Sequence, residues 1–187
     1  LEERSPLIDV LVPMVNLVVT SWLGGSTESV YPGRGGWLFY RPDVEHVTGP
    51  GFLEPERLAA RLLANPDGEP DPRAAFIELR DALQARGIAL VVVPVPLKPT
   101  IYPDRYVRRA ENAVGPMRNT SQAAWLDAMR ADGIDVVDLA ADFWQARQID
   151  NVPLYLRSDT HWTPAGVALA SDLIADHIEA LDLDWAG

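Results

Sequence analysis

The sequence predicts an α/β fold in which helices flank a mostly parallel sheet. A helical pattern, a glycine and a strand pattern follow one another twice, over residues 71–96 and again over 121–139. Two such units in series are typical of a parallel sheet, because parallel strands need a crossover connection that is usually a helix. The length of 187 residues and the hydrophobic content of 48% fit one globular domain.

The first unit begins with Asp71 and Pro72, a helix N-cap followed by a first-turn proline. Gly87 stands where a left-handed residue ends many helices, so we predict a helix from about Pro72 to Arg86. The run IALVVVPVP at 88–96 follows and has no polar alternation before its prolines. We therefore expect a strand that is buried on both faces.

The second unit repeats this order. Ser121 is a potential N-cap, Gly133 a potential helix end, and IDVVDL at 134–139 a second strand. The apolar residues expected on the buried face of its helix are Ala124, Leu126 and Met129.

The residues before these units divide into two parts. We expect residues 1–30 to be a helical extension and 31–187 to be the main domain. The apolar stretch at 7–23 is interrupted by Asp9 and Pro13 and is too short to span a bilayer comfortably, so it predicts an amphipathic or partly buried helix. GRGGWLFY, which ends at Tyr40, predicts a tight turn that enters a short strand at 37–40.

Composition excludes several functions. With 16 basic and 27 acidic residues the net charge is −11, and we expect no nucleic-acid partner because such binding depends on neutralising phosphates. The chain has no cysteine, which rules out disulfides, zinc-thiolate sites and a cysteine nucleophile. The glycines of GRGGWLFY lack the P-loop spacing and lysine, and no motif implies a cofactor.

The most informative stretch is LRSDTHWTPAGV at 154–165. Thr163 and Pro164 predict the capped start of a helix, and Trp162 fits the position of a hydrophobic staple. Asp159 and His161 need another explanation. In an extended segment, residues two apart project to the same side, so the carboxylate can hold one ring nitrogen while the other nitrogen takes a proton from a hydroxyl.

The other two histidines are weaker candidates. We interpret His46 as a loop residue and His177 as a surface or boundary residue of the last helix. A metal site that combines Asp159 and His161 with Glu45 or His46 is conceivable, but its spacing is not diagnostic, and we predict no metal site.

A long loop at 96–120 follows the first predicted strand. Because ligands bind at the carboxyl ends of strands in open α/β sheets, Lys98 and Tyr102 are candidates for substrate binding. Trp162 is a further candidate, as a surface on which a sugar could stack.

Three segments together resemble the SGNH-hydrolase-like domain of the AlgJ and AlgX type alginate O-acetyltransferases. They are GRGGWLFYRPDVEHVTGPGF, VVVPVPLKPTIYPDRY and LRSDTHWTPAGV, in that order. The resemblance implies a three-layer SGNH-like fold and an acyltransferase that acts in exopolysaccharide biosynthesis. It also implies that Asp159 and His161 are the acid and base of a Ser-His-Asp triad.

Further expectations follow from the same resemblance. They are a polysaccharide substrate, a membrane-bound acyl donor protein as partner, and a periplasmic location. Since the chain begins with Leu1 rather than methionine, we expect a missing targeting segment that could also anchor the protein to a membrane.

One part of the family pattern is missing. The family's nucleophilic serine lies in a Gly-Asp-Ser segment after the D-x-H pair, and no serine of this chain follows Gly-Asp. Ser158 adjoins the pair, but neighbours in an extended chain point to opposite faces, which makes it a poor nucleophile. The predicted sheet is also short: two core strands, 37–40, and a further one at 154–157. We therefore expect the domain to be incomplete at its C-terminus.

Three functions stay open from the sequence. The favoured one is O-acetylation of an exported bacterial polysaccharide, with the serine outside this chain. The second is an inactive module that binds a polysaccharide or a partner, with Trp37, Tyr102 or Trp162 as stacking surfaces. The third is a polysaccharide acetylesterase, because the same triad delivers the acyl group to water when no sugar hydroxyl is held there.

Overall fold

A computed structural model of the chain describes residues 29–149 and 153–181. The helix expected at 7–23 lies outside the described residues. In chain order the elements are β1 (Val30–Pro32), the 3₁₀ turn η1 (Arg34–Gly36), β2 (Leu38–Tyr40), α2 (Arg41–Thr48), α3 (Pro55–Ala64), α4 (Arg73–Gln84), β3 (Val91–Val92), α5 (Lys98–Ile101), α6 (Pro103–Tyr106), η2 (Arg108–Asn112), α7 (Gln122–Ala131), β4 (Asp135–Val136), α8 (Ala140–Ile149) and α9 (Pro164–Ala180).

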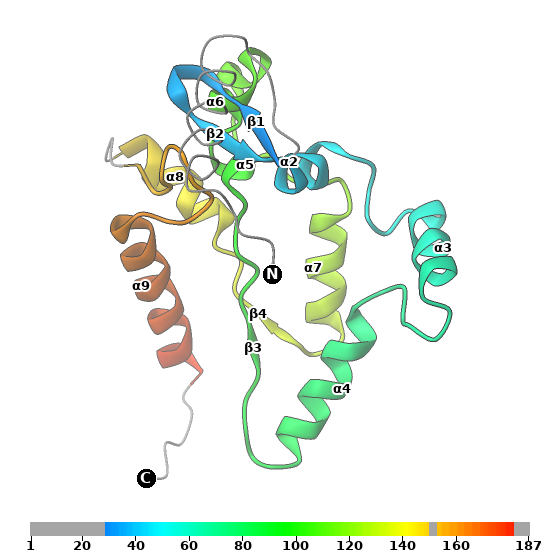
Figure 1. The fold of residues 1–187 in the computed structure, drawn as a ribbon. Helices are drawn as coiled ribbons and strands as arrows, with labels where there is room; N and C mark the ends of the chain where they lie inside the picture. Colours follow the sequence, from blue (N-terminus) through cyan, green and yellow to red (C-terminus); the bar gives the residue numbers. More distant parts are fainter. Residues whose placement is uncertain (1–28, 150–152, 182–187) are drawn as a thin grey trace, which may run out of the picture.

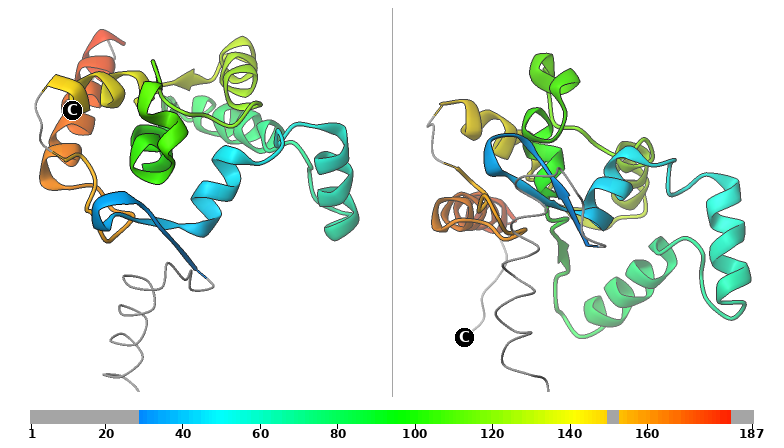
Figure 2. Two further views of the ribbon diagram at one scale, coloured as in Figure 1. Left: turned by 90° about the horizontal axis from the view of Figure 1, so that it is seen from above. Right: turned by 45° about the horizontal axis from the view of Figure 1, so that its top comes forward.

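Strands β3 and β4 are the centre of a three-layer arrangement (Figure 1). They pair in parallel, with Val91 opposite Asp135 and Val92 opposite Val136. Helix α9 lies on one side of the pair, and α4 and α7 lie on the other (Figures 1 and 2). Both predicted helix-Gly-strand units are therefore present, and the α/β fold is confirmed.

Alternate residues of the two strands enter two different cores. Val92 and Val136 belong to a cluster with Trp125 and Met129 of α7. The residue directly after each strand, Val93 or Val137, packs against a second cluster that includes Ala170 of α9. This follows from the strand period of two, which sends successive side chains to opposite faces.

Burial of the first strand on both faces was a wrong prediction. Val91 and Val92 are half-buried, while Ile88 and Val95 at the ends of the apolar run are 50% and 61% exposed. Only a two-residue ladder joins β3 to β4, and no residue of α4 is fully buried, so the helix covers this run incompletely.

The segment before the first unit contains more structure than the sequence predicted. The strand expected at 37–40 is confirmed as β2, which pairs antiparallel with β1. Helices α2 and α3 were not predicted, and His46 lies in α2 rather than in a loop. The predicted loop at 96–120 contains α5, α6 and η2.

The starts of α4 and α7 differ from the predicted caps. The N-cap of α4 is Pro72, one residue later than predicted, although Asp71 Oδ1 accepts from the Arg73 backbone N–H at 3.0 Å. Ser121 precedes α7, but its hydroxyl accepts from the Leu53 N–H at 3.1 Å and makes no cap hydrogen bond. On α7 the buried side chains are those of Trp125, Leu126 and Met129, whereas Ala124 is exposed.

Gly87 offers a test of backbone conformation without a packing contribution. Its φ is +72°, and a Cβ built there meets no atom within 4 Å. Gly87→Ala should therefore lower the free energy of unfolding by about 1–2 kcal/mol, the cost of the left-handed conformation for alanine, as measured by urea denaturation. Gly115→Ala is the matched control, because Gly115 also has open space but no positive φ. An equal effect at both positions would contradict the interpretation.

No helix in the described ranges is long and apolar enough to cross a membrane.

Candidate active site

The loop that carries Asp159 and His161 doubles back on itself between residues 154 and 163. Tyr155 and Trp162 form an isolated antiparallel bridge. The Leu156 N–H donates to the His161 carbonyl at 3.0 Å, and the Thr163 N–H donates to the Leu154 carbonyl at 2.9 Å. A sheet strand at 154–157 was therefore a wrong prediction: these residues form a tight turn with one isolated bridge, although the Arg157 carbonyl also accepts from the Leu38 N–H of β2 at 2.9 Å.

Helix α9 begins directly after this turn, as predicted. The Thr163 hydroxyl accepts from the Gly166 N–H at 3.3 Å, so the helix start fixes the end of the loop. Val167, the expected partner of Trp162 in a hydrophobic staple, is 50% exposed. The Trp162 ring packs on Phe143 of α8, with ring centroids 5.2 Å apart.

Asp159 and His161 form the pair that their spacing predicted. Asp159 Oδ1 accepts from the His161 backbone N–H at 2.9 Å and lies 2.5 Å from Nδ1 of the ring. Together these contacts lower the pKa of Asp159, the backbone hydrogen bond most and the ring contact next. Because Nδ1 is engaged, the tautomer with its proton on Nδ1 is favoured, and Nε2 is left as the acceptor.

The ring is accessible from solvent. The His161 side chain is 81% exposed, and its Nε2 makes no hydrogen bond within the described part of the chain. The pair opens into a shallow pocket of about 260 Å³. Its lining residues are Val30, Leu38, Phe39, Tyr40, Ser158, Asp159, Thr160 and His161.

Tyr40 is a site residue that sequence reasoning missed. It is 44% exposed and lines the same pocket as His161. The only signal in the sequence was its place at the end of a predicted strand. That place does not predict that Tyr40 lines the same pocket as Asp159 and His161.

The three residues predicted to bind substrate are mostly held inside the protein. Lys98 and Tyr102 are 1% and 7% exposed, and Trp162 is half-buried. The Tyr102 hydroxyl accepts from the Leu154 N–H at 3.0 Å, and its ring lies 4.6 Å from that of Trp37. This burial favours packing roles for all three side chains over the predicted substrate contact.

The remaining histidines have structural partners. The His46 ring stacks on Phe52, with centroids 5.6 Å apart. His177 Nε2 lies 2.8 Å from a carboxylate oxygen of Asp135, so it joins α9 to β4 and is not only a surface residue. Across residues 29–149 and 153–181, no group of three or more histidine, aspartate or glutamate side chains could hold a metal ion.

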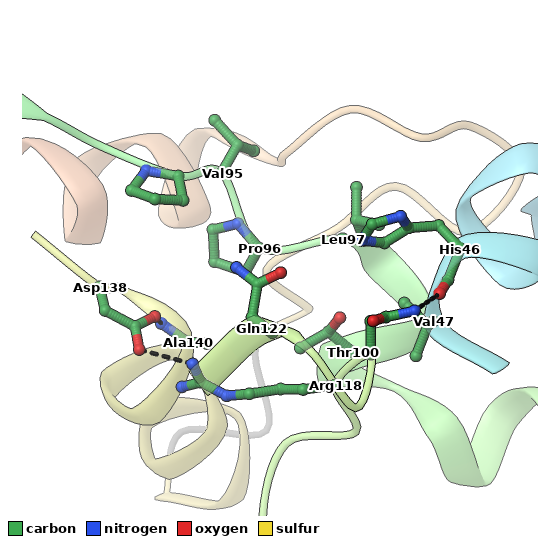
Figure 3. Close-up of a pocket in the computed structure, with 12 residues that line it drawn as sticks. His46, Val47, Val95, Pro96, Leu97, Thr100, Arg118, Gln122, Asp138 and Ala140 are labelled. Carbon is green, nitrogen blue, oxygen red and sulfur yellow. Dashed lines mark hydrogen bonds and ion pairs between the residues drawn. The ribbon is translucent and has the colours of Figure 1, made fainter. Parts of the chain in front are cut away.

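A second cavity lies at the carboxyl ends of β3 and β4 (Figure 3). It has a volume of about 170 Å³, and its polar lining includes the ion pair of Arg118 with Asp138 at 2.6 Å. Asn119 also lines it and donates to the His46 carbonyl at 2.6 Å. Neither Asp159 nor His161 lines this cavity, so it is separate from the pocket that they share.

The lowered pKa of Asp159 has a consequence that can be measured. The pairing stabilises the folded chain above the ordinary aspartate pKa, and this stabilisation is lost as the pH falls through the lowered value. We expect the Asp159 carboxyl carbon to titrate below pH 3.8 by NMR. In His161→Ala the midpoint should rise only part of the way, because the backbone N–H of residue 161 remains. An unchanged midpoint in this variant would show that the ring does not contact the carboxylate.

Comparison with known proteins shows the family of this chain. A family model described as the SGNH hydrolase-like domain of acetyltransferase AlgX matches residues 30–186. "Probable alginate O-acetylase AlgJ" of Pseudomonas aeruginosa is 29% identical over 151 residues, which cover 81% of this chain and 33% of that protein. The protein of the same name from Pseudomonas syringae pv. tomato is 33% identical over 103 residues, 55% of this chain and 25% of that protein.

A solved structure agrees with the sequence comparisons. The O-acetyltransferase domain of Pseudomonas putida AlgJ superposes with a TM-score of 0.61 and 25% identity over 85% of this chain and 50% of that one. The chain thus spans about a third of the length of the first curated relative and half of the solved domain. Its SGNH-like fold is confirmed, and the chain belongs to the SGNH hydrolase-like domain family of acetyltransferase AlgX.

Proposed function

We propose that this chain contributes the acid–base half of an O-acetyltransferase that acts on an exported bacterial polysaccharide. The observation that carries the proposal is the contact of 2.5 Å between Asp159 and His161 Nδ1, with the rest of the ring exposed in an open pocket. A base that is oriented through one nitrogen and accessible through the other is what activation of a hydroxyl needs.

The nucleophile in this proposal is a serine outside the 187 residues. Ser121 is buried and bound to Leu53, and Ser158 lines the pocket without a hydrogen bond to His161. This chain covers 33% of the length of the Pseudomonas aeruginosa relative, so a protein of that length has space for such a segment.

The mechanism then has two halves. His161 Nε2 takes the proton of the serine hydroxyl as its oxygen attacks the acetyl carbonyl, and the proton passes to the leaving group of the donor. In the second half, His161 takes a proton from a sugar hydroxyl as the sugar oxygen attacks the acetyl-serine ester, and it passes this proton to the departing serine oxygen, which regenerates the serine. Asp159 holds the ring and stabilises the imidazolium in both halves. We further propose a periplasmic location and a membrane-bound acyl donor protein as partner.

Tyr40 fits the acceptor side of this pocket. Its exposed ring beside His161 can stack on the apolar face of a sugar. The polysaccharide would then lie across β2 with one hydroxyl near Nε2.

The test is an acetyl-transfer assay of the full-length protein with an acetyl ester as donor, with and without a neutral and a uronate polysaccharide. If the protein is a transferase, acetyl groups appear on the glycan, and the donor is consumed faster when glycan is present. Donor consumption with release of acetate alone would identify an esterase. Glycan binding without consumption, unchanged in His161→Ala, would identify a binding module and contradict the proposal.

A further inference from the structure

The ammonium group of Lys98 lies between β2 and the loop of the acid–base pair. Its Nζ donates to the carbonyl oxygens of Leu38, Arg157 and Asp159 at 2.6, 2.9 and 3.0 Å. The side chain extends from the first residue of α5, which is 60 residues from Leu38 and 61 from Asp159 in the sequence. Lys98 therefore joins three chain segments at one buried point.

The chemistry of this point suits an ammonium group. Lysine has three N–H donors and no acceptor, and here each donor has one carbonyl. Nζ also lies 4.9 Å from the ring centre of Trp37 and 5.2 Å from that of Phe39, within the range of cation–π attraction. Burial lowers the pKa of Lys98 to about 8, while Asp159 acts in the opposite direction, so the ammonium form persists at neutral pH.

The composition of the chain also indicates that this position is specific for lysine over arginine. Lys98 is the only lysine, and the other 15 of the 16 lysine and arginine residues are arginine. A guanidinium is planar and larger, with five donors in a fixed fork, and it cannot aim three donors from a single nitrogen. The position therefore requires lysine for its geometry as well as for its charge.

The hydrogen bonds continue from Lys98 to the imidazole. The carbonyl of Asp159 accepts from Lys98, and the carboxylate of the same residue accepts from the backbone N–H and approaches the ring of His161. Arg157, two residues earlier, accepts at its carbonyl from both Lys98 and the Leu38 N–H. Two points of the loop backbone are thus fixed to β2 and α5.

We propose that Lys98 is a positioning residue for the acid–base pair, because its ammonium group fixes the peptide backbone from which Asp159 orients His161. The catalytic consequence rests on the proposed function, whereas the geometric role does not and can be tested without an activity assay.

The first experiment measures hydrogen exchange of the His161 amide by NMR in Lys98→Met, with global unfolding subtracted. We expect exchange to accelerate by at least about tenfold, since the acceptor Asp159 is no longer held in place. Met129→Ala is the control: Met129 is fully buried in the other cluster, so this variant destabilises the fold without touching the loop. Equal protection of His161 in Lys98→Met and in the wild type would overturn the proposal.

Asp159→Ala separates this inference from the proposed function, because alanine has no side-chain oxygen to accept from the His161 N–H. If Asp159→Ala accelerates exchange but Lys98→Met does not, the pair exists and Lys98 does not position it. If neither variant changes exchange, the pair itself is absent, and both proposals fail.

A measurement on the wild type covers the case in which Lys98→Met does not fold. Labelling with ¹⁵N-lysine gives a single side-chain signal, because the sequence has one lysine. We expect the three Nζ protons to be visible at neutral pH and to exchange slowly, as a buried, fully bonded ammonium requires. Exchange as rapid as that of free lysine would overturn the proposal.

Discussion

Asp159→Asn is expected to reduce kcat for acetyl transfer by about 10⁴, with little change in KM. The carboxylate contacts Nδ1 at 2.5 Å and favours the tautomer whose Nε2 is free to accept a proton. An amide can instead donate to Nδ1, which places the ring proton on Nε2 and removes the base. His161→Ala should reduce kcat at least as strongly, because no group remains to take the proton.

The measurement is a steady-state assay of the full-length protein with an acetyl ester and a polysaccharide acceptor. Asp172→Asn is the matched control: Asp172 is an exposed aspartate on α9 without a hydrogen bond or ion pair among the described residues, and this variant should retain the parent rate. Activity of Asp159→Asn within about threefold of the parent would remove Asp159 from the triad, since triad aspartates contribute far more than that.

Ser158 provides a test of where the nucleophile lies. It is the serine beside Asp159 in the pocket, so Ser158→Ala should leave an acetyl-enzyme intermediate detectable by mass spectrometry if the nucleophile is elsewhere. Loss of the intermediate in this variant would place the nucleophile within these residues and contradict the proposed external serine.

The contact between Asp159 and His161 could be predicted from sequence because it is local. Asp159 and His161 are two residues apart, and the cap of α9 at Thr163 fixes where the extended segment ends. The glycine ends of both helices were predictable for the same reason: Gly87 and Gly133 have φ of +72° and +78°.

The support of the pair could not be predicted, because it depends on contacts across about sixty residues. Lys98 was interpreted as a substrate contact because it follows a strand, but its three acceptors belong to β2 and the D-x-H loop. Helix α8 was missed because its largest apolar residues, Phe143 and Trp144, are adjacent and give no helical period.

Phe143→Ala is expected to have the largest effect on stability, a loss of about 3–5 kcal/mol in the free energy of unfolding. Phe143 is fully buried, and its ring packs against Tyr155 and Trp162 at centroid distances of 6.4 and 5.2 Å. Removing the Phe143 ring leaves a cavity next to Tyr155 and Trp162, at the two ends of the loop that carries Asp159 and His161. Urea denaturation measures the loss, and Val114→Ala is the control, since Val114 is fully exposed and should change stability by less than about 0.5 kcal/mol.

The same variant connects the core to the site. If the packing of Phe143 on Tyr155 and Trp162 holds the loop, the Asp159 carboxyl in Phe143→Ala should titrate closer to pH 3.8 than in the wild type. A large loss of stability with an unchanged Asp159 titration would show that Lys98 and the local turn are enough to hold the pair. A loss below about 1 kcal/mol would contradict the burial of Phe143, because truncation of a buried aromatic side chain has a larger effect in well-packed cores.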